Sequence, residues 1–206
     1  MTADRDGSIP EWVIATTNAG KLREIRDILA GLGLRLRGLD EFPPLTFPDE
    51  GDDYGANAAA KARTAARATG RPALADDSGL EVAGLGGAPG PRSARYGGPG
   101  LDDRQRAATL LEALDGCDES GRIARFVCVA ALATPAGGVT TARGECAGRI
   151  LRAPRGDGGF GYDPIFEVAP GISMAELPEA EKNRVSHRAN ALRELVAATL
   201  GPPRAG

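Results

Sequence analysis

The chain has 206 residues, of which 42% are hydrophobic and 26% charged, and its formal net charge at pH 7 is −3. These values are ordinary for one globular domain, and the lack of a basic excess argues against a protein that coats DNA or anionic lipid. A few well-placed cations can still hold a small anionic ligand, and the longest apolar run, 126–133, is too short for a membrane span of about 20 helical residues.

The ends of the chain show no recognisable targeting segment. Residues 1–12 are acidic and short of apolar side chains, which is unlike a secretory signal. The three cysteines form no CxxC pair, and an odd number of thiols is typical of free cysteines in a reducing compartment. We therefore expect a cytoplasmic protein with a single domain over residues 1–206 and loose tails at 1–11 and 201–206.

Strands and helices alternate through the first half of the chain. Apolar side chains that recur every three or four residues predict a helix from about Lys21, which Gly33 stops, and an alanine-rich helix that ends at Gly70. Short apolar or alternating runs predict the strands. The expected elements are a strand at 12–15, a helix at 21–33, a strand at 34–39, an acidic proline-rich loop at 40–54, a helix at 57–69 and a strand at 72–75.

The second half is expected to contain a hairpin and two glycine-rich loops. The segment Pro-Ala-Gly-Gly at 135–138 lies between two runs of strand character, which is a hairpin signal. Strands that alternate with helices, together with one hairpin, predict an α/β fold with a mixed sheet. The expected elements are a loop at 84–100, a helix at 102–114, strands at 122–134 and 139–145, a loop at 156–161 and a last helix that begins between Glu179 and Ser186.

The turn after the first strand is a candidate anion site. It consists of small polar residues followed by a lysine: Thr16, Thr17, Asn18, Ala19, Gly20 and Lys21. A strand–turn–helix junction presents free backbone N–H groups and the positive end of a helix, and Lys21 adds a full charge. The Walker A pattern GxxxxGK[ST] is absent, and a turn that merely connects two elements is the alternative.

Two adjacent carboxylates, Asp76 and Asp77, follow the predicted buried strand at 72–75. Ligand sites in α/β sheets gather at strand ends, and alternation along the chain points the two side chains in different directions. One can therefore bind a metal while the other accepts backbone hydrogen bonds. The acidic loop at 49–53 is a second source of carboxylates, and hard oxygen ligands favour Mg²⁺, which also takes phosphate oxygens. An aspartate turn and a solvated acidic surface are the alternatives.

Two further segments carry side chains suited to a nucleotide. Phe160 lies between glycines, so its ring is free to stack on a base, which contributes about 1–3 kcal/mol, although a core phenylalanine would give the same pattern. Lys182 and Ser186 share a face if both are helical, and His187 and Arg188 are possible donors to a base carbonyl or a phosphate. A structural role for the lone histidine is the alternative.

Taken in order, these segments resemble the inosine/xanthosine triphosphate pyrophosphatase family from about residue 12 to residue 200. The resemblance rests on ATTNAGK at 15–21, Asn57 with Lys61, ADDSGL at 75–80, GAPG at 87–90 with SARY at 93–96, GFGYDP at 159–164, MAEL at 174–177, and Lys182 with SHR at 186–188. It implies an elongated mixed α/β fold of two lobes with an active-site cleft between them, a homodimer, and Mg²⁺-dependent hydrolysis of ITP, dITP and XTP to the monophosphate and pyrophosphate.

The resemblance also implies roles for individual residues. Asp77 would be the general base and a metal ligand, with Ser78 beside it on the substrate, and the turn at 16–21 would hold the triphosphate. The nucleotide would be lined by Phe160, Gly161, Tyr162, Asp163, Lys182, His187 and Arg188. The chain has 22 arginines but only three lysines, all in the matched motifs, where they would balance phosphate charge: Lys21, Lys61 and Lys182.

The second metal carboxylate stays open between Asp49 and Glu50. Relatives usually carry Glu-Thr-Gly-x-Thr-Phe where this chain has Asp-Glu-Gly-Asp-Asp-Tyr at 49–54. Counting back from Asn57 gives Asp49 as the ligand, and a slip of one residue gives Glu50. Asp53 in place of a hydroxyl residue also adds negative charge to this loop.

The mechanistic hypothesis is that water attacks the α-phosphorus while Lys21 and neighbouring amides hold the leaving pyrophosphate. Donors aimed at purine O6 would accept hypoxanthine and xanthine, whereas adenine presents a donor of its own there. The candidates are His187, Arg188 and backbone amides near Phe160. A pyrophosphatase for modified pyrimidine nucleotides and a non-catalytic nucleotide sensor are the alternatives, and we expect neither a nucleic acid nor a membrane as partner.

Overall fold

The computed structural model describes residues 9–201, and the chain divides into two compact units. The first unit contains residues 9–77, 128–144 and 188–201, and the second contains residues 78–127 and 145–187. Most of the two expected tails, 1–8 and 202–206, lies outside the described residues. In the part of the chain that the structure describes, no helix is both long and apolar enough to cross a membrane.

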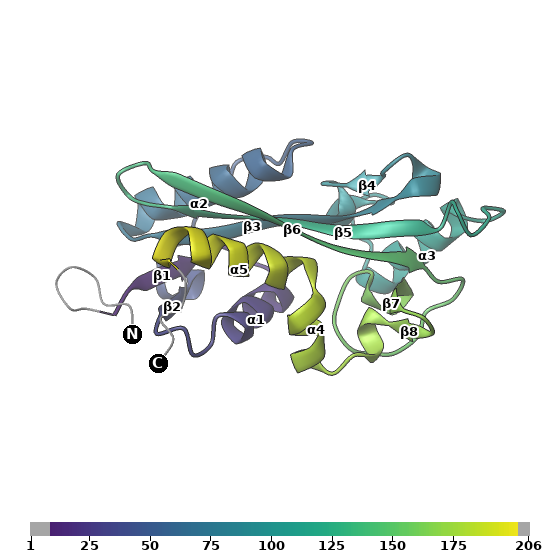
Figure 1. Cartoon of the computed structure of the whole chain (residues 1–206). Coiled ribbons are helices and arrows are strands. Elements are labelled where there is room, and N and C mark those ends of the chain that lie inside the picture. Colours follow the sequence, from purple (N-terminus) through teal and green to yellow (C-terminus); the bar gives the residue numbers. More distant parts are fainter. Residues whose placement is uncertain (1–8, 202–206) are drawn as a thin grey trace. The chain divides into compact units, whose positions relative to one another are not determined.

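The strands form a mixed sheet in the order β2-β1-β3-β5-β6-β7-β8, with β4 paired to β3 (Figure 1). The strands are β1 (Glu11–Ile14), β2 (Arg35–Gly38), β3 (Ala73–Val82), β4 (Pro89–Gly90), β5 (Ile123–Ala133), β6 (Val139–Ile150), β7 (Phe166–Ala169) and β8 (Ile172–Ser173). The α-helices are α1 (Ala19–Ile28), α2 (Tyr54–Thr69), α3 (Asp103–Ala113), α4 (Glu179–Val185) and α5 (His187–Leu200). β1 pairs in parallel with β2 and β3, whereas β4 on β3, β7 on β6 and β8 on β7 are antiparallel, which confirms the predicted mixed α/β class.

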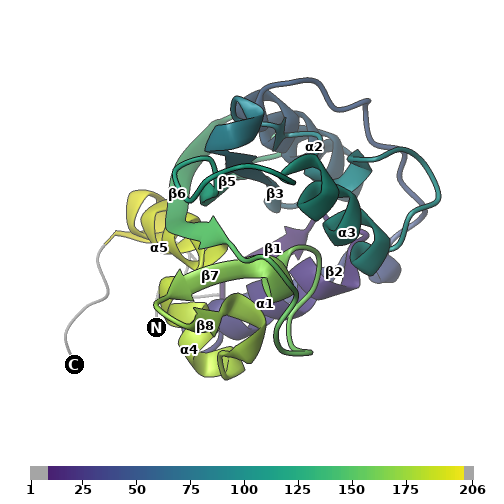
Figure 2. The same ribbon diagram turned by 90° about the vertical axis from the view of Figure 1, so that its right-hand side faces the viewer.

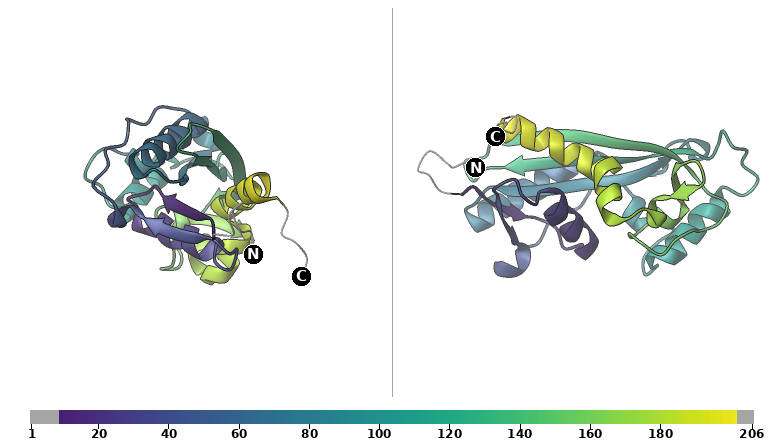
Figure 3. Two further views of the ribbon diagram at one scale, coloured as in Figure 1. Left: turned by 90° about the vertical axis from the view of Figure 1, so that its left-hand side faces the viewer. Right: turned by 60° about the horizontal axis from the view of Figure 1, so that its bottom comes forward.

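In the first unit, helices cover both faces of the strands. α1 and α5 lie on one face and α2 lies on the other (Figure 1), and α5, the yellow helix of Figure 3, runs along the strands. Trp12 and Ile14 of β1 share a buried cluster with Ile25 of α1 and Leu192 of α5. Because successive side chains of a strand point to opposite faces, each strand of this unit presents alternate residues to the two helix layers.

Side-chain caps decide where the first two helices begin. Asn18 accepts a hydrogen bond from the backbone N–H of Lys21 at 2.9 Å, and α1 begins two residues earlier than predicted. Asp53 caps α2 in the same way, and that helix begins three residues earlier than predicted. Gly70 ends α2 as predicted, with the positive φ of +66° that glycine adopts readily.

β3 is longer than predicted, and this corrects the position of the two aspartates. The strand runs for ten residues, so Asp76 and Asp77 lie inside it and not in a turn after it. β4 continues the ladder by pairing Gly90 with Leu80. Gly79 permits this approach, because a Cβ on it would lie 2.0 Å from the carbonyl oxygen of Gly90. The polar run indicated a turn because buried carboxylates are rare in strands unless cations pair with them.

The second unit has its own core around Phe126 and Phe166, whose ring centroids are 4.5 Å apart. Leu110 of α3 and Ile150 of β6 are fully buried in the same cluster. β6 runs five residues beyond its predicted end, and the antiparallel pair β7 and β8, seen side by side in Figure 2, was not predicted. Strands of two to four residues are too short for an alternating pattern to identify them.

The predicted last helix is two helices, α4 and α5. α4 ends at Val185, and Ser186 has an extended backbone with ψ of 149°. The N–H of Ser186 donates to the carbonyl oxygen of Lys182 at 2.9 Å, which closes α4. His187 then opens α5, so the SHR motif lies at the junction of two helices and not within one.

The buried face of α5 gives a direct test of the core. Leu192 is fully buried in the cluster that α5 shares with α1 and β5, whereas Leu32 is 38% exposed. Leu192→Ala leaves a cavity, so we expect the free energy of unfolding, measured by urea denaturation, to fall by about 2–5 kcal/mol. The control Leu32→Ala should change it by less than about 0.5 kcal/mol. Equal losses in the two variants would contradict this packing.

Candidate functional site

The turn between β1 and α1 has the geometry of an anion-binding helix start. The side chain of Asn18 accepts from the N–H of Lys21, and the N–H of Asn18 donates to Oγ1 of Thr16 at 3.2 Å. The N–H groups of Ala19 and Gly20 open the helix, where no carbonyl of the same helix can accept from them. Thr17, Asn18 and Ala19 are exposed, so an anion can approach these groups from solvent.

Asp76 is a buried carboxylate that several groups of the first unit surround. Its Oδ2 lies 3.0 Å from Nζ of Lys21 and 3.3 Å from both Nε and Nη2 of Arg188. The thiol of Cys128 donates to the same oxygen at 3.8 Å. Burial alone raises the pKa of Asp76, but the neighbouring cations, Lys21 first and then Arg188, outweigh it and hold the pKa well below its usual range. Asp76 is therefore ionised at any pH near neutrality.

Arg188 is held between two carboxylates. Its guanidinium pairs with Asp76 on one side and donates from Nη1 to Oε2 of Glu24 on the other. The side chain is 2% exposed, and although burial lowers its pKa, Asp76 and Glu24 raise the pKa above its ordinary value. Sequence reasoning missed Glu24, which lies one turn along α1 from Lys21 and so faces the same side of that helix. The predicted contact of Arg188 with a nucleotide stays a prediction.

Asp77 contacts the opposite layer, as strand alternation predicts. Its Oδ2 accepts from Nδ2 of Asn57 at 2.8 Å, and its Oδ1 lies 3.4 Å from Nζ of Lys61, both on α2. Burial raises the pKa of Asp77, and the partial compensation by Lys61 and Asn57 leaves it above the ordinary aspartate value. The pKa of Lys61 is also raised, because Asp77, Asp76 and Glu50 together outweigh the effect of its burial. The two adjacent aspartates thus have pKa shifts of opposite sign.

The acidic loop brings Glu50, rather than Asp49, to this pair. Oε1 of Glu50 lies 2.8 Å from Nζ of Lys61, whereas Asp49 is exposed. Asn57 holds the loop in place: its side chain accepts from the N–H of Gly51 at 2.8 Å and donates to the carbonyl of Gly51 at 3.0 Å. Asn57 therefore links the loop to Asp77, a role that sequence reasoning did not assign to it.

In the second unit, a buried ion pair supports the ring of Phe160. Oδ2 of Asp163 accepts from the N–H of Phe160 at 2.9 Å and from Nζ of Lys182 at 2.5 Å. Nζ of Lys182 lies 4.9 Å from the centroid of the Phe160 ring, which is half-buried. The structure thus brings together three of the predicted nucleotide-lining residues. Ser78, on β3 of this unit, is half-buried.

Two other predicted nucleotide contacts belong to the core of this unit. The hydroxyl of Tyr162 donates to the carbonyl oxygen of Ser93 at 2.9 Å, and burial raises the pKa of that hydroxyl. The His187 ring stacks on Phe126 at 4.7 Å, with 13° between the planes. Gly161 contributes its N–H to a hydrogen bond with Asp103 on α3 at 2.8 Å. Contacts of these three residues with a nucleotide stay predictions.

Comparison with known proteins decides the family. The model of the Ham1 family matches residues 12–198. The chain belongs to the Ham1 family. A dITP/XTP pyrophosphatase of Syntrophobacter fumaroxidans is 51% identical over 185 residues, which cover 89% of this chain and 79% of that protein. A dITP/XTP pyrophosphatase of Thermus thermophilus is 50% identical over 193 residues, which cover 93% of each.

Solved structures of Ham1-family proteins share the fold. A HAM1 protein from Coxiella burnetii is 43% identical, with a TM-score of 0.82 over 92% of this chain and 98% of that one. A nucleoside-triphosphatase and dITP/XTP pyrophosphatase from Mycobacterium abscessus is 40% identical, with a TM-score of 0.72 over 90% of this chain and 98% of that one. The predicted family and the predicted mixed α/β class are both confirmed.

The carboxylates of the first unit fit the Mg²⁺ ion that the family resemblance implies. Across residues 9–201, no three His, Cys, Asp or Glu side chains gather as a metal-binding group. Two carboxylates do converge, because Glu50 and Asp77 both contact the ammonium of Lys61 and so already share a cation. Mg²⁺ typically takes one or two protein carboxylates and completes its shell with phosphate oxygens and water. Glu50 and Asp77 are therefore the residues that would hold it.

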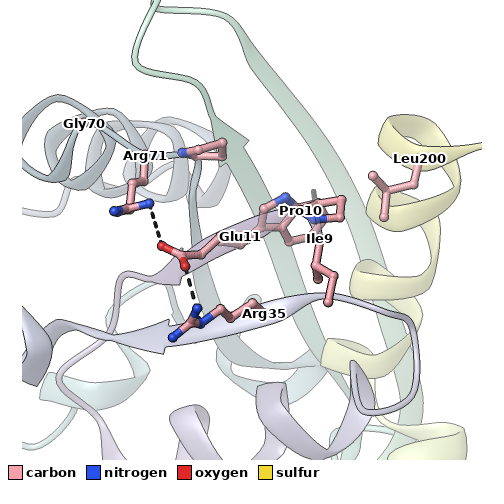
Figure 4. Close-up of a pocket in the computed structure, with 9 residues that line it drawn as sticks. Ile9, Pro10, Glu11, Arg35, Gly70, Arg71 and Leu200 are labelled. Atoms are coloured by element: carbon pink, nitrogen blue, oxygen red, sulfur yellow. Dashed lines mark ion pairs between the residues drawn. The ribbon is translucent and has the colours of Figure 1, made fainter. Parts of the chain in front are cut away.

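A cavity of about 620 Å³ lies at the N-terminal end of β1, whereas the turn at 16–21 follows its C-terminal end (Figure 4). Glu11 crosses it, with Oε1 2.7 Å from Nη1 of Arg71 and Oε2 3.5 Å from Nε of Arg35. Ile9, Pro10 and Leu200 supply apolar walls. The arginines are already paired with Glu11, and none of the predicted site residues lines this cavity.

The pairing of Asp76 with buried cations predicts a large loss of stability when its charge is removed. Asp76→Asn takes away one of the two carboxylates that hold buried Arg188, and breaking a buried ion pair typically costs about 3–5 kcal/mol. Urea denaturation should show this loss. The control Glu119→Gln breaks exposed pairs with Arg149 and Arg152, and it should produce no measurable change. Equal stability of the two variants would show that the Asp76 pairs carry no stability.

Proposed function

We propose that the chain hydrolyses the deaminated purine nucleotides dITP, ITP and XTP to the monophosphate and pyrophosphate, and so removes them from the nucleotide pool. One observation carries the proposal: a single buried strand presents Asp76 to Lys21, at the start of α1, and Asp77 to Lys61 on α2. The proposed general base, Asp77, and two ammonium groups thus occur in one unit with a helix start suited to an anion. The names of the Ham1-family relatives, dITP/XTP pyrophosphatase, support the substrate class.

The triphosphate would bind to the turn at 16–21. The N–H groups of Ala19 and Gly20 and the ammonium of Lys21 are suited to phosphate oxygens, and Lys61 adds a second positive charge. Cations placed where charge develops in the transition state act without reorganisation, which makes them effective in phosphoryl transfer. Lys21 is held on Asp76 before substrate arrives, so its position is fixed in advance.

Asp77 would accept the proton of the attacking water. Burial raises the pKa of Asp77 above the ordinary aspartate value, which makes it a stronger base than an exposed aspartate, and Asn57 fixes its orientation. The water attacks the α-phosphorus, the bond between that phosphorus and the bridging oxygen breaks, and the pyrophosphate carries away the electron pair. Mg²⁺, held by Asp77 and Glu50 when bound, supplies neutralisation of phosphate charge.

The second unit would recognise the purine base of the nucleotide. The Phe160 ring supplies a stacking surface of a kind that contributes about 1–3 kcal/mol per base. His187 and the backbone amides near Phe160 would supply donors for purine O6. Adenine presents a donor at that position and would leave such groups unpaired, which is the basis of strong discrimination. Arg188, the other predicted donor, belongs to the first unit, where Asp76 and Glu24 hold it.

An assay of pyrophosphate release tests both the substrate class and the role of Asp77 as general base. The wild-type protein with Mg²⁺ should turn over dITP and XTP far faster than dATP or dUTP, and chelation of Mg²⁺ should stop turnover. Asp77→Asn should lower kcat by about 10²–10⁴-fold, the contribution typical of a general base. Comparable turnover of dATP and dITP would defeat the selectivity, preferred turnover of dUTP would favour a pyrimidine enzyme, and binding without turnover would favour a sensor.

A matched pair of variants decides the second carboxylate. Glu50→Gln removes the charge that contacts Lys61, whereas Asp49→Asn removes an exposed charge one residue away. We expect Glu50→Gln to raise the Mg²⁺ concentration needed for half-maximal activity by at least about 10-fold and Asp49→Asn to leave it near wild type. Losing even an outer group that orients a metal ligand typically costs about 10–100-fold in affinity. The reverse order would assign the role to Asp49.

The homodimer and the cytoplasmic location are further proposals. The homodimer rests on the family resemblance, and the location rests on the three free cysteines, which are typical of a reducing compartment. Sedimentation of the purified chain tests the first. Fractionation of cells that express it tests the second.

A further inference from the structure

We propose that Asp103 is a positioning residue for the loop that carries Phe160, an inference that rests on the proposed stacking role of that ring. Oδ2 of Asp103, in the first turn of α3, accepts a hydrogen bond from the N–H of Gly161 at 2.8 Å. That N–H belongs to the peptide group that joins Phe160 to Gly161. The bond therefore fixes the plane of the peptide next to the ring.

On the N-terminal side of Phe160, the loop is held by backbone contacts. The N–H of Gly158 donates to the carbonyl oxygen of Ala175, in the short 3-10 helix η5 (Met174–Glu176), at 3.1 Å. The approach is close, because a Cβ on Gly158 would lie 2.7 Å from that oxygen and one on Gly156 would lie 2.8 Å from the carbonyl carbon. Side chains at either glycine would push the loop away from η5.

Phe160 thus lies between two kinds of anchor. On the N-terminal side of Phe160 the loop packs on η5. The N–H of Phe160 donates to Asp163, which also holds Lys182 beside the ring. On its C-terminal side Gly161, with φ of +63°, redirects the chain, and Asp103 fixes it there. Without Asp103 the C-terminal side of the ring loses this anchor, and the ring direction would be less well defined.

The contact of Asp103 is separate from the capping of α3. The cap is made by Asp102, whose side chain accepts from the N–H of Gln105 at 2.8 Å while Gln105 accepts from the N–H of Asp102 at 2.9 Å. These reciprocal bonds provide acceptors for two backbone N–H groups at the start of the helix. Asp103 is exposed, and in α3 it adds only a favourable charge near the helix N-terminus.

The expected effect is on substrate binding and not on the chemical step. A stacking surface acts alike on bound substrate and transition state, so loosening it raises KM and leaves kcat unchanged. Asp103→Ala should raise the KM for dITP by about 3–10-fold, the change expected from the loss of one hydrogen bond. Asp103→Asn keeps an acceptor oxygen and should restore KM to near the wild-type value, although it removes the charge.

A double-mutant cycle tests whether Asp103 acts through the ring. Phe160→Ala should raise KM on its own, and adding Asp103→Ala should then have little further effect, because the group being positioned is gone. Independent action of the two residues would multiply their effects on KM and would overturn the proposal. An unchanged KM in Asp103→Ala alone would also overturn it.

The adjacent aspartate provides the control for helix stability. Asp102→Ala removes the cap of α3, so it should lower the melting temperature while leaving the KM for dITP unchanged. An equal rise in KM for Asp102→Ala and Asp103→Ala would show that both effects come from general destabilisation, and it would overturn the positioning role. An unchanged KM in Phe160→Ala, together with loss of kcat in Asp77→Asn, would overturn the stacking role and this inference but leave the proposed hydrolysis standing.

Discussion

The first unit depends on the pairing of two adjacent carboxylates within one buried strand. Moving an ion out of water costs several kcal/mol even after the protein relaxes, so Asp76 and Asp77 require partners on both faces of the strand. Strand alternation sends Asp76 towards α1 and α5 and Asp77 towards α2, and each layer supplies a lysine to meet its carboxylate. The placement of Lys21, Lys61 and Arg188 follows from that single constraint.

The same pairing separates the pKa values of the two aspartates, and with them the roles that we propose for them. Asp76 meets Lys21 and Arg188 and its pKa falls, so it stays a fixed anion that holds cations in place. Asp77 has weaker compensation and its pKa rises, which suits a group that must accept a proton. Neighbouring groups whose environments push their pKa values apart mark acid–base assignments in many enzymes. Here the difference between the two pKa values arises from the helix layer that each side chain faces, because both residues are aspartates.

Much of this arrangement could be predicted from the sequence, because its signals are local. Helical periodicity located α1 and α2, and Gly70 marked the end of α2, although α1 ends at Ile28 and not at the predicted Gly33. Strand alternation predicted that Asp76 and Asp77 would diverge. The scarcity of lysine singled out Lys21, Lys61 and Lys182, and the structure shows an ion pair with an acidic residue for each. The family resemblance joined these local signals into one function.

What could not be predicted depends on contacts between distant segments. β3 continues through a polar run because β4 pairs with it and cations neutralise its charges, and neither partner is visible in the run itself. Glu24 is an ordinary helix residue until Arg188, 164 positions later, lies against it. The hydroxyl of Tyr162 donates to the carbonyl oxygen of Ser93, 69 residues earlier, and its ring packs in the core, contacts that the local sequence does not reveal.

The two units hold their candidate groups by different means, and the difference suits what each would bind. In the first unit, long-range charge fixes Lys21 and Lys61, which is appropriate for a triphosphate whose recognition is mainly electrostatic. In the second, glycines let the loop before Phe160 pack backbone against backbone on η5, and a single buried pair, Asp163 with Lys182, supports the ring. Discrimination between purines depends on the exact direction of a few hydrogen bonds, so a surface fixed by short backbone contacts serves it better than flexible charged side chains would. A stacking ring accepts any base, and selectivity for O6 must therefore come from donors that this rigid support keeps aligned.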